Sequence, residues 1–234
     1  MNVFYNAELP ADSIKLNVEE SRHCIKVLRL RAGDHILLIN GKGSIFEAVI
    51  RDADAKACIL DIIREEKPGN SRSYHLTIAI APTKNMDRFE WFIEKSTEIG
   101  IDRIIPLMCR HSERKEFKRE RLDKILIAAM KQSGQLYLPD LNGMTPFREL
   151  INQPFAGDKM IAHCDEGARN AFKHAFAPGN NVLVLIGPEG DFDPEEIKAA
   201  LEKGFVPVSL GDSRLRTETA GLVACHTVCL VNQV

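Results

Sequence analysis

The stretch Leu183–Ile197 has the sequence LVLIGPEGDFDPEEI, and a second stretch of the same design, VPVSLGDSRLRTETAGLVACHTVCLV, occupies Val206–Val231. Each starts with a short apolar run, continues through a polar loop that contains glycine, and ends in a sequence suited to a helix. Uninterrupted runs of Val, Leu and Ile are typical of strands that are buried on both faces of a parallel sheet. The two stretches therefore predict two strand–loop–helix units of an α/β fold.

Local signals set the boundaries of both units. In the first unit the strand is predicted over Val182–Ile186, and Asp193 followed by Pro194 is typical of an N-cap and the first residue of a helix. In the second unit a strand over Val206–Leu210 leads through a loop to a helix for which Thr217 is the expected N-cap. In open parallel sheets, ligands bind at the loops that follow the carboxyl ends of the strands.

Neither loop has a common phosphate-binding sequence. The dinucleotide fingerprint G-x-G-x-x-G and the phosphate loop G-x-x-x-x-G-K-[ST] are both absent from the chain, which disfavours a dinucleotide-dependent oxidoreductase. What remains is a pocket lined by backbone N–H and C=O groups, which could bind an adenine and a zwitterionic cofactor without a metal. The alternative is that both segments are ordinary turns between a strand and a helix.

Composition limits the class of protein. The chain has 234 residues and is 44% hydrophobic, which is enough for one large core or two modest ones. Six cysteines without a C-x-x-C pair or a secretory segment predict a reduced cytoplasmic protein with free thiols. No apolar run approaches the ~20 residues that span a bilayer. Cys225, His226 and Cys229 do not predict zinc, because a helix would place His226 on a different face.

The first 68 residues predict a small β-barrel of short antiparallel strands. Three alternating apolar segments lie close together, and Asn40–Gly43 between two of them is a hairpin signal. A helix is expected over Ser21–Leu30. The polar segment Glu65–Ser73 contains Pro, Gly and Ser and predicts a linker, so a second domain is expected over residues 74–234. The three strands are predicted over residues 35–39, 44–50 and 57–63.

Four cations of the N-terminal domain are the candidate RNA-binding residues, although a net charge of −2 does not by itself indicate a nucleic-acid-binding protein. On the predicted helix, Arg22, Lys26 and Arg29 would share one face by the i, i+4, i+7 rule. Arg31 follows closely. Such a cluster can contact phosphate groups. The alternative for Arg29 is an ion pair with Asp34.

The second domain alternates strands with helices, as expected for an α/β domain with a mostly parallel sheet. Charged or polar residues follow two of its strands: Glu113 and Arg114 follow one, and His163, Asp165 and Glu166 follow another. These residues are candidates for lining a site, and the alternative is simple exposure to solvent. Besides the two units described first, strands are predicted over residues 74–81, 101–107 and 159–164, and helices over residues 87–99 and 120–135.

Several segments of the chain resemble the signature sequences of one protein family. IGPEGDF and LGDSRLRTETA resemble the signature loops of the RsmE family of SPOUT-class methyltransferases. The resemblance covers most of the chain. The segments that carry it are Ile186–Phe192, Leu210–Ala220, Ala81–Lys84, Glu94–Gly100, Lys131–Gln135, and His23 together with Val27–Arg29 and Gly33–Asp34.

The chain departs from the family pattern at four positions. Asp191 stands where the family usually has a second glycine after GPEG, and Ser213 stands where it usually has arginine, with Arg214 one residue later. Lys131 and Gln135 replace the usual glutamate and arginine. The other core residues of the two loops are intact, so an active enzyme remains the expectation. The departures at Ser213 and Gln135, together with the barrel-like N-terminal domain, support the alternative of a non-catalytic RNA-binding or ribosome-assembly module.

The resemblance implies both a fold and an activity. It implies a PUA-like RNA-binding domain over residues 1–68, and a SPOUT methyltransferase domain over residues 74–234 whose C-terminal loops form a deep trefoil knot. It also implies a homodimer that uses S-adenosylmethionine to methylate N3 of a specific uridine in small-subunit ribosomal RNA, within the assembled 30S subunit. Neither a membrane nor a metal is expected to take part.

The resemblance places the cofactor against both loops. Methylation of N3 requires loss of its proton, and a cation would stabilise the charge left on the ring. We expect Arg216 to be that cation, Glu218 to hold Arg216 or act as the base, and Glu189 to be the second candidate base. Both carboxylates could instead serve only at the helix starts. The expected cofactor-binding residues are Leu185, Ile186, Gly187, Pro188, Glu189, Gly190, Leu210, Gly211, Ser213, Leu215, Arg216, Thr219 and Ala220.

Overall fold

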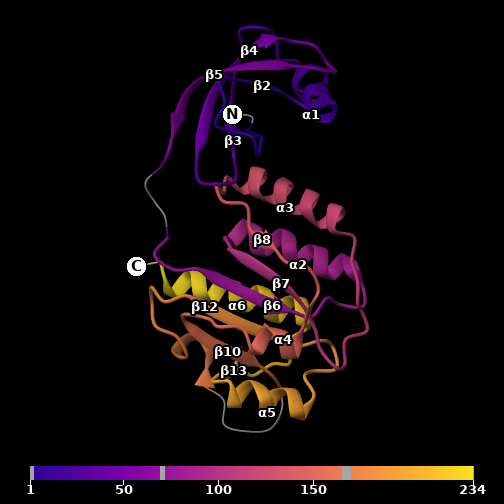
Figure 1. Ribbon diagram of the computed structural model, residues 1–234, viewed down its shortest axis with the longest axis vertical. Coiled ribbons are helices and arrows are strands. Elements are labelled where there is room, and N and C mark those ends of the chain that lie inside the picture. The colour runs from indigo at the N-terminus through magenta and orange to yellow at the C-terminus, as the bar shows by residue number, and fades with distance from the viewer. Residues whose placement is uncertain (1–2, 69–71, 165–169, 234) are drawn as a thin grey trace. The chain divides into compact units, whose positions relative to one another are not determined.

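The computed structural model of the protein describes residues 3–68, 72–164 and 170–233 (Figure 1). The chain divides into two compact units. The first comprises Met1–Ser71 together with the short segment Ser133–Leu138, and the second comprises Arg72–Gln132 and Pro139–Val234. The first unit thus includes a segment from far along the chain, which the domain bounds predicted from the sequence assign to the second.

The first unit is built on a five-stranded sheet in the order β1-β3-β4-β5-β2. The hairpin predicted at Asn40–Gly43 joins the antiparallel strands β3 and β4, but β1 runs parallel to β3. Among the described residues the edge strands β1 and β2 do not pair, so hydrogen bonds do not close the sheet into the predicted barrel. The strands are β1 (Val3–Tyr5), β2 (Ser13–Lys15), β3 (His35–Ile39), β4 (Ile45–Asp52) and β5 (Ile59–Glu66).

The helix of this unit begins earlier than predicted and ends sooner. Helix α1 (Val18–Arg22) starts after Asn17, whose side chain accepts the Glu20 N–H at 2.8 Å. It continues as the π-helical turn η1 (His23–Val27). Ser21 does not head the helix, because its hydroxyl is buried and donates to the Leu16 carbonyl at 3.1 Å. The predicted helix to Leu30 is therefore wrong in both boundaries.

The segment Ser133–Leu138 packs on the β3–β4 hairpin within the first unit. The Leu138 N–H donates to the Gly41 carbonyl at 2.9 Å, and the Gly43 N–H donates to the Leu136 carbonyl at 3.0 Å. Gly43 has a φ of 94°, and a Cβ there would lie 2.4 Å from the Tyr137 hydroxyl. Glycine is thus required at Gly43 both for the turn and for the close approach of Tyr137.

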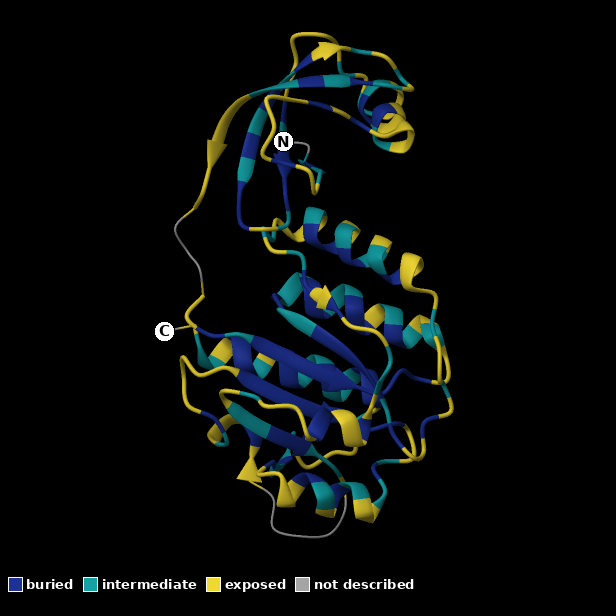
Figure 2. Cartoon of the chain, viewed as in Figure 1, coloured by how far each residue is buried: buried dark blue, intermediate teal, exposed yellow. Residues whose placement is uncertain are grey.

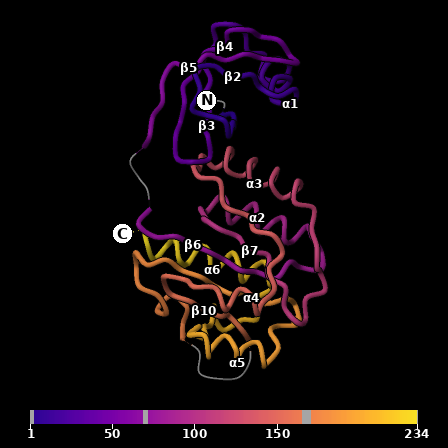
Figure 3. Tube along the Cα trace, viewed as in Figure 1, coloured from indigo at the N-terminus to yellow at the C-terminus, as the bar shows by residue number. Residues whose placement is uncertain are grey.

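The second unit contains an eight-stranded sheet in which every pairing is parallel, as the alternation of strands and helices predicted. The path is β11-β13-β10-β12-β6-β7-β8, with β9 also paired to β7. Strands β6 and β12 lie side by side although they are far apart in the sequence (Figure 3). The strands are β6 (Leu76–Ile80), β7 (Arg103–Met108), β8 (Asp140–Leu141), β9 (Thr145–Pro146), β10 (Asp158–Ala162), β11 (Asn170–Ala171), β12 (Val182–Ile186) and β13 (Val206–Ser209).

Helices cover both faces of this sheet, so its central strands are buried along their length (Figure 2). Helices α2 and α6 pack together, with α6 against β6 and β12, while residues of α4 and α5 share a core with the other face. None of the described helices is long and apolar enough to cross a membrane. The helices are α2 (Met86–Ile99), α3 (Arg119–Ser133), α4 (Phe147–Ile151), η2 (Phe172–His174), α5 (Pro194–Glu202) and α6 (Thr217–Val231).

The starts of α5 and α6 differ in how well the sequence predicts them. Helix α5 has the expected N-cap at Asp193, which forms a reciprocal capping box with Glu196. In α6 the N-cap is Arg216 rather than the predicted Thr217, and no side chain caps this end. Helix α6 is buried along one face, but Leu230 on its other side is 56% exposed.

Replacing Gly221 by alanine is expected to lower the free energy of unfolding by about 0–2 kcal/mol. An added Cβ would lie 2.7 Å from a ring carbon of Phe92 in α2 and 2.8 Å from Cδ1 of Ile80 in β6. Overpacking costs about 1–3 kcal/mol, and the better helix propensity of alanine offsets about 1 kcal/mol of it. Urea denaturation measures the difference. Gly143→Ala is the control, because an added Cβ there meets nothing within 4 Å.

Candidate functional site

The loops that follow β10, β12 and β13 surround two adjoining cavities at the carboxyl edge of the parallel sheet. The first has a volume of about 300 Å³ and the second about 290 Å³. This is the edge at which open parallel sheets bind ligands. The residues that line both cavities are Ala162, Cys164, Arg214, Leu215 and Ala220.

Most of the residues predicted to bind a cofactor line one or both cavities. Leu185, Gly190 and Thr219 do not. Leu185 is fully buried in the core that includes α4 and α5, and an added Cβ on Gly190 would approach His111. The predicted residues in the first cavity are Ile186, Gly187, Pro188, Glu189, Leu215, Arg216 and Ala220, and those in the second are Leu210, Gly211, Ser213, Leu215 and Ala220.

A side-chain hydrogen bond joins the two glycine-containing loops. The Thr217 hydroxyl donates to the Gly187 carbonyl at 3.1 Å, and Thr217 is buried. Thr217 is the first residue of α6 rather than its N-cap, and its hydroxyl bonds to the other loop. The backbone at Gly187 is also closely packed, because an added Cβ would lie 3.1 Å from the ring of Phe192. The hydrogen bond and the close packing therefore hold the backbone of Gly187, which lines the first cavity.

Asp191 occupies the position where the RsmE family usually has glycine, and its backbone shows why. Its φ is 63°, in the left-handed region that glycine adopts without strain. Here the carboxylate compensates by accepting the Cys164 N–H at 2.7 Å and the Phe192 N–H at 2.8 Å. The side chain thereby connects the loop after β10 to the loop after β12, and it lines the first cavity.

Glu189 belongs to a polar network at the mouth of the first cavity. Its Oε1 accepts the Lys84 N–H at 2.9 Å, and the Arg114 guanidinium donates to the Lys84 carbonyl at 2.7 Å. Lys84 Nζ lies 2.8 Å from a carboxylate oxygen of Glu113, and this hydrogen bond raises the pKa of Lys84. Glu113 and Arg114 thus contact Lys84, but neither is among the residues that line the two cavities. His163 lines the second cavity, whereas Asp165 and Glu166 lie outside the described residues.

Arg216 and Glu218 do not form the contact that one of the sequence hypotheses required. Arg216 is exposed, lines the first cavity and has no ion pair among the described residues. The buried Glu218 lies instead 3.9 Å from Nε of Arg88, which comes from the first turn of α2 and also lines the cavity. The sequence interpretation missed Arg88. The signal for it was its place at the start of the helix that follows the Ala81–Lys84 segment.

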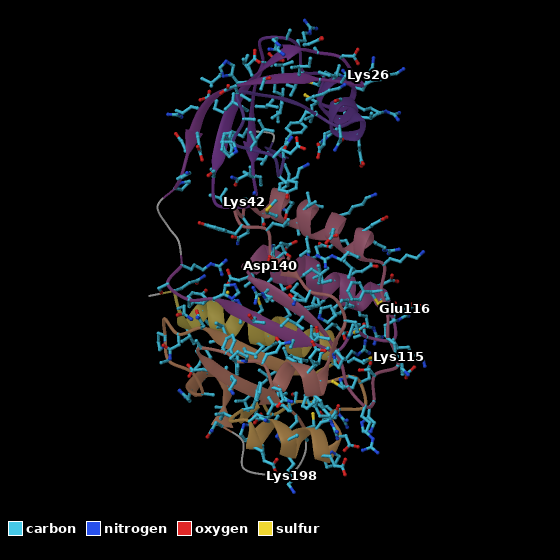
Figure 4. All side chains as sticks on the ribbon, viewed as in Figure 1. Lys26, Lys42, Lys115, Glu116, Asp140 and Lys198 are labelled. Atoms are coloured by element: carbon cyan, nitrogen blue, oxygen red, sulfur yellow. The ribbon has the colours of Figure 1, made fainter. Side chains whose placement is uncertain are left out.

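The four predicted RNA-binding cations are exposed, but not on one helical face. Arg22 ends α1, Lys26 lies in the π-helical turn, and Arg29 has a φ of 58°, beyond the helix end. The i, i+4, i+7 argument is therefore wrong. Lys26 points away from the first unit (Figure 4). Asp34 accepts the backbone N–H of Arg31 at 2.7 Å rather than pairing with Arg29, and in the described ranges none of the four cations has an ion pair.

Comparisons with known proteins agree with this architecture. The family described as RNA methyltransferase domain matches residues 70–229, and the family described as RNA methyltransferase PUA domain matches residues 16–63. A solved structure described as a probable rRNA-methyltransferase from Porphyromonas gingivalis is 44% identical in sequence, with a TM-score of 0.92. The match covers 98% of this chain and 99% of the Porphyromonas gingivalis chain. The chain thus belongs to the RNA methyltransferases.

Two relatives narrow the family. Ribosomal RNA small subunit methyltransferase E of Bacillus subtilis is 28% identical over 93% of this chain and 90% of its own length. The structure of the Neisseria gonorrhoeae protein of the same name, bound to S-adenosyl methionine, is 28% identical with a TM-score of 0.84, covering 96% of this chain and 95% of that one. The resemblance to the RsmE family is thereby confirmed, and the chain is a member of it.

Proposed function

We propose that the protein transfers the methyl group of S-adenosylmethionine to N3 of one uridine in small-subunit ribosomal RNA. The observation that carries this proposal is the pair of cavities enclosed by the two family loops, at the sheet edge where such folds bind ligands. The resemblance in these loops implies that the target is U1498 of 16S rRNA in the assembled 30S subunit. The relative from Neisseria gonorrhoeae, which is similar over nearly the whole chain, has S-adenosyl methionine bound.

The residues present suit this cofactor. The second cavity is lined largely by the loop Ser209–Leu215, whose backbone groups can bind the edge of an adenine. The first cavity adjoins it and has acidic and basic side chains, among them Glu189 and Arg216, which suit the end of S-adenosylmethionine that carries the methyl group. S-adenosylmethionine would supply an electrophilic methyl group. The chain would orient this methyl group toward N3 and stabilise the charge on the uracil ring. Holding the two reactants together can lower the activation barrier by up to ~7–11 kcal/mol.

The chemistry assigns roles to three side chains. The uracil N3 must lose its proton, because only its lone pair can attack the methyl carbon as the bond from that carbon to sulfur breaks. Arg216 faces the cavity and would stabilise the negative charge on the flanking uracil oxygens. Glu189 lines the cavity and is a candidate base, while Glu218, which does not line it, is the other. N3 lies on the pairing edge of uracil, so the base must be unpaired or flipped out.

The assembly is also part of the proposal. Helix α6 leaves the apolar side chain of Leu230 exposed, which suits burial against a second copy of the chain in a homodimer. The family resemblance further implies a deep trefoil knot formed by the C-terminal loops. The six free cysteines suit a reducing compartment, and we propose the cytoplasm, where ribosomal subunits are assembled. Chromatography with light scattering tests the dimer.

Methyl transfer to 30S particles from a strain that lacks the gene tests the proposed function. With radiolabelled S-adenosylmethionine, we expect the purified protein to label 16S rRNA. Mass spectrometry of the digested RNA should then show N3-methyluridine at one position that is unmodified in the deletion strain. Tight binding of 30S particles without any methyl transfer would instead support a non-catalytic assembly role. Methylation at another atom or nucleotide would contradict the proposed target.

A further inference from the structure

A buried carboxylate lies behind the first cavity. Only 9% of the Glu218 side chain is exposed, and its Oε1 lies 3.9 Å from Nε of Arg88. Its Oε2 is buried and has no hydrogen-bond partner within the described part of the chain. A buried acceptor left unsatisfied lowers the stability of the fold, so folding stability alone does not account for a glutamate at position 218. Its only ion pair in the described ranges is the one with Arg88.

Arg88 extends from this buried carboxylate to the cavity. Its side chain is 41% exposed and lines the first cavity together with Arg214 and Arg216. Neither Arg214 nor Arg216 has an ion pair among the residues described. Of these three arginines, Arg88 is therefore the one with a carboxylate of the described residues within ion-pair distance. A guanidinium oriented in this way keeps N–H donors free for a second planar or anionic group.

We propose that Arg88, oriented by Glu218, binds an anionic oxygen of a reactant in the first cavity. Two reactants of the proposed function, on which this inference rests, carry such an oxygen. One is the carboxylate of S-adenosylmethionine, and the other is the uracil ring after N3 has lost its proton. Glu218 is then a positioning residue that acts through Arg88, and Glu189 remains the candidate base.

Arg88→Ala distinguishes the two sources of the oxygen. Calorimetry compares S-adenosylmethionine with 5′-methylthioadenosine, which lacks the amino-acid carboxylate. If Arg88 binds that carboxylate, the variant loses about 10–100-fold in affinity for S-adenosylmethionine and none for 5′-methylthioadenosine. If Arg88 binds the uracil oxygen, both affinities are retained and kcat on 30S particles falls by about 10²–10³-fold. Arg88→Lys, which keeps the charge, should restore part of either loss.

Glu218→Gln tests the positioning role. It keeps the size of the side chain but removes the charge that orients Arg88, so it should reproduce part of the Arg88→Ala loss. In the double variant with Arg88→Ala it should cause no further loss, because it has no guanidinium left to orient. A further loss in the double variant, with an altered pH dependence of kcat, would show that Glu218 acts independently as a base and would overturn its positioning role.

Arg121→Ala is the matched control, because Arg121 also pairs with a carboxylate of α2, Glu90, at 2.6 Å but does not line the cavity. It should leave binding and kcat within about threefold. The proposal is overturned if Arg88→Ala behaves like this control in both assays. If the wild-type protein itself fails to methylate 30S particles, the proposed function fails. In that case the calorimetric binding assay alone tests the role of Arg88. Unchanged affinity of Arg88→Ala for S-adenosylmethionine then overturns that role.

Discussion

Arg216→Ala should lower methyl transfer by about 10²–10³-fold while S-adenosylmethionine still binds. Arg216 is exposed on the first cavity and makes no ion pair in the described ranges, so its removal breaks no contact that supports the fold. Arg216 is the N-cap residue of α6, but its side chain makes no cap hydrogen bond, so its replacement by alanine removes no such bond. The loss should therefore fall on stabilisation of the charged uracil in the transition state.

Cofactor binding by Arg216→Ala can be followed by calorimetry and by protection of a thiol. Cys164 lines both cavities and is exposed, whereas the other five cysteines are buried. Bound S-adenosylmethionine should therefore slow alkylation of Cys164 by iodoacetamide in the variant as in the wild type. Loss of both the calorimetric signal and the protection would make Arg216 a cofactor-binding residue and would contradict its role as the charge-stabilising cation.

Replacing Arg29 and Arg31 together by alanine should weaken binding of 30S particles by about 10–100-fold at low salt. Both side chains are exposed and have no carboxylate partner among the described residues, so they can meet phosphates without first breaking an ion pair. Each phosphate contact that is lost should also reduce the slope of log K against log salt by about 0.7–0.9. Binding measured over a series of salt concentrations gives both quantities.

A second pair of arginines in the same unit provides the control. Arg51 lies 2.9 Å from Asp61, and Arg64 lies 2.6 Å from Glu66, so local carboxylates already neutralise both. Replacing Arg51 and Arg64 by alanine removes the same charge but should change the salt slope little. Equal slopes for the wild type and the Arg29 and Arg31 double variant would remove this cluster from the RNA-binding surface, whatever the methylation assay shows.

Local sequence signals predicted the elements that position the site. The run Val182–Ile186 is the strand β12 with the predicted bounds, because a continuous apolar run suits a strand covered on both faces. Asp193 and Pro194 begin α5 as expected, because an N-cap acts within a few residues. The two family loops were recognisable because each is a continuous segment of the sequence. The structure brings them together around the cavities.

Contacts between distant residues decided what the sequence left open. The Thr217 hydroxyl bonds to Gly187 rather than capping α6, and Glu218 pairs with Arg88 rather than with Arg216. Asp191 has a left-handed backbone, and its carboxylate accepts the backbone N–H of Cys164 from another loop. The sequence by itself determined the buried strand β12, the capped start of α5 and the family loops, since these depend on neighbours in the chain. Only the tertiary structure decided which polar side chain meets which, because those partners lie far apart in the sequence and converge only at the sheet edge.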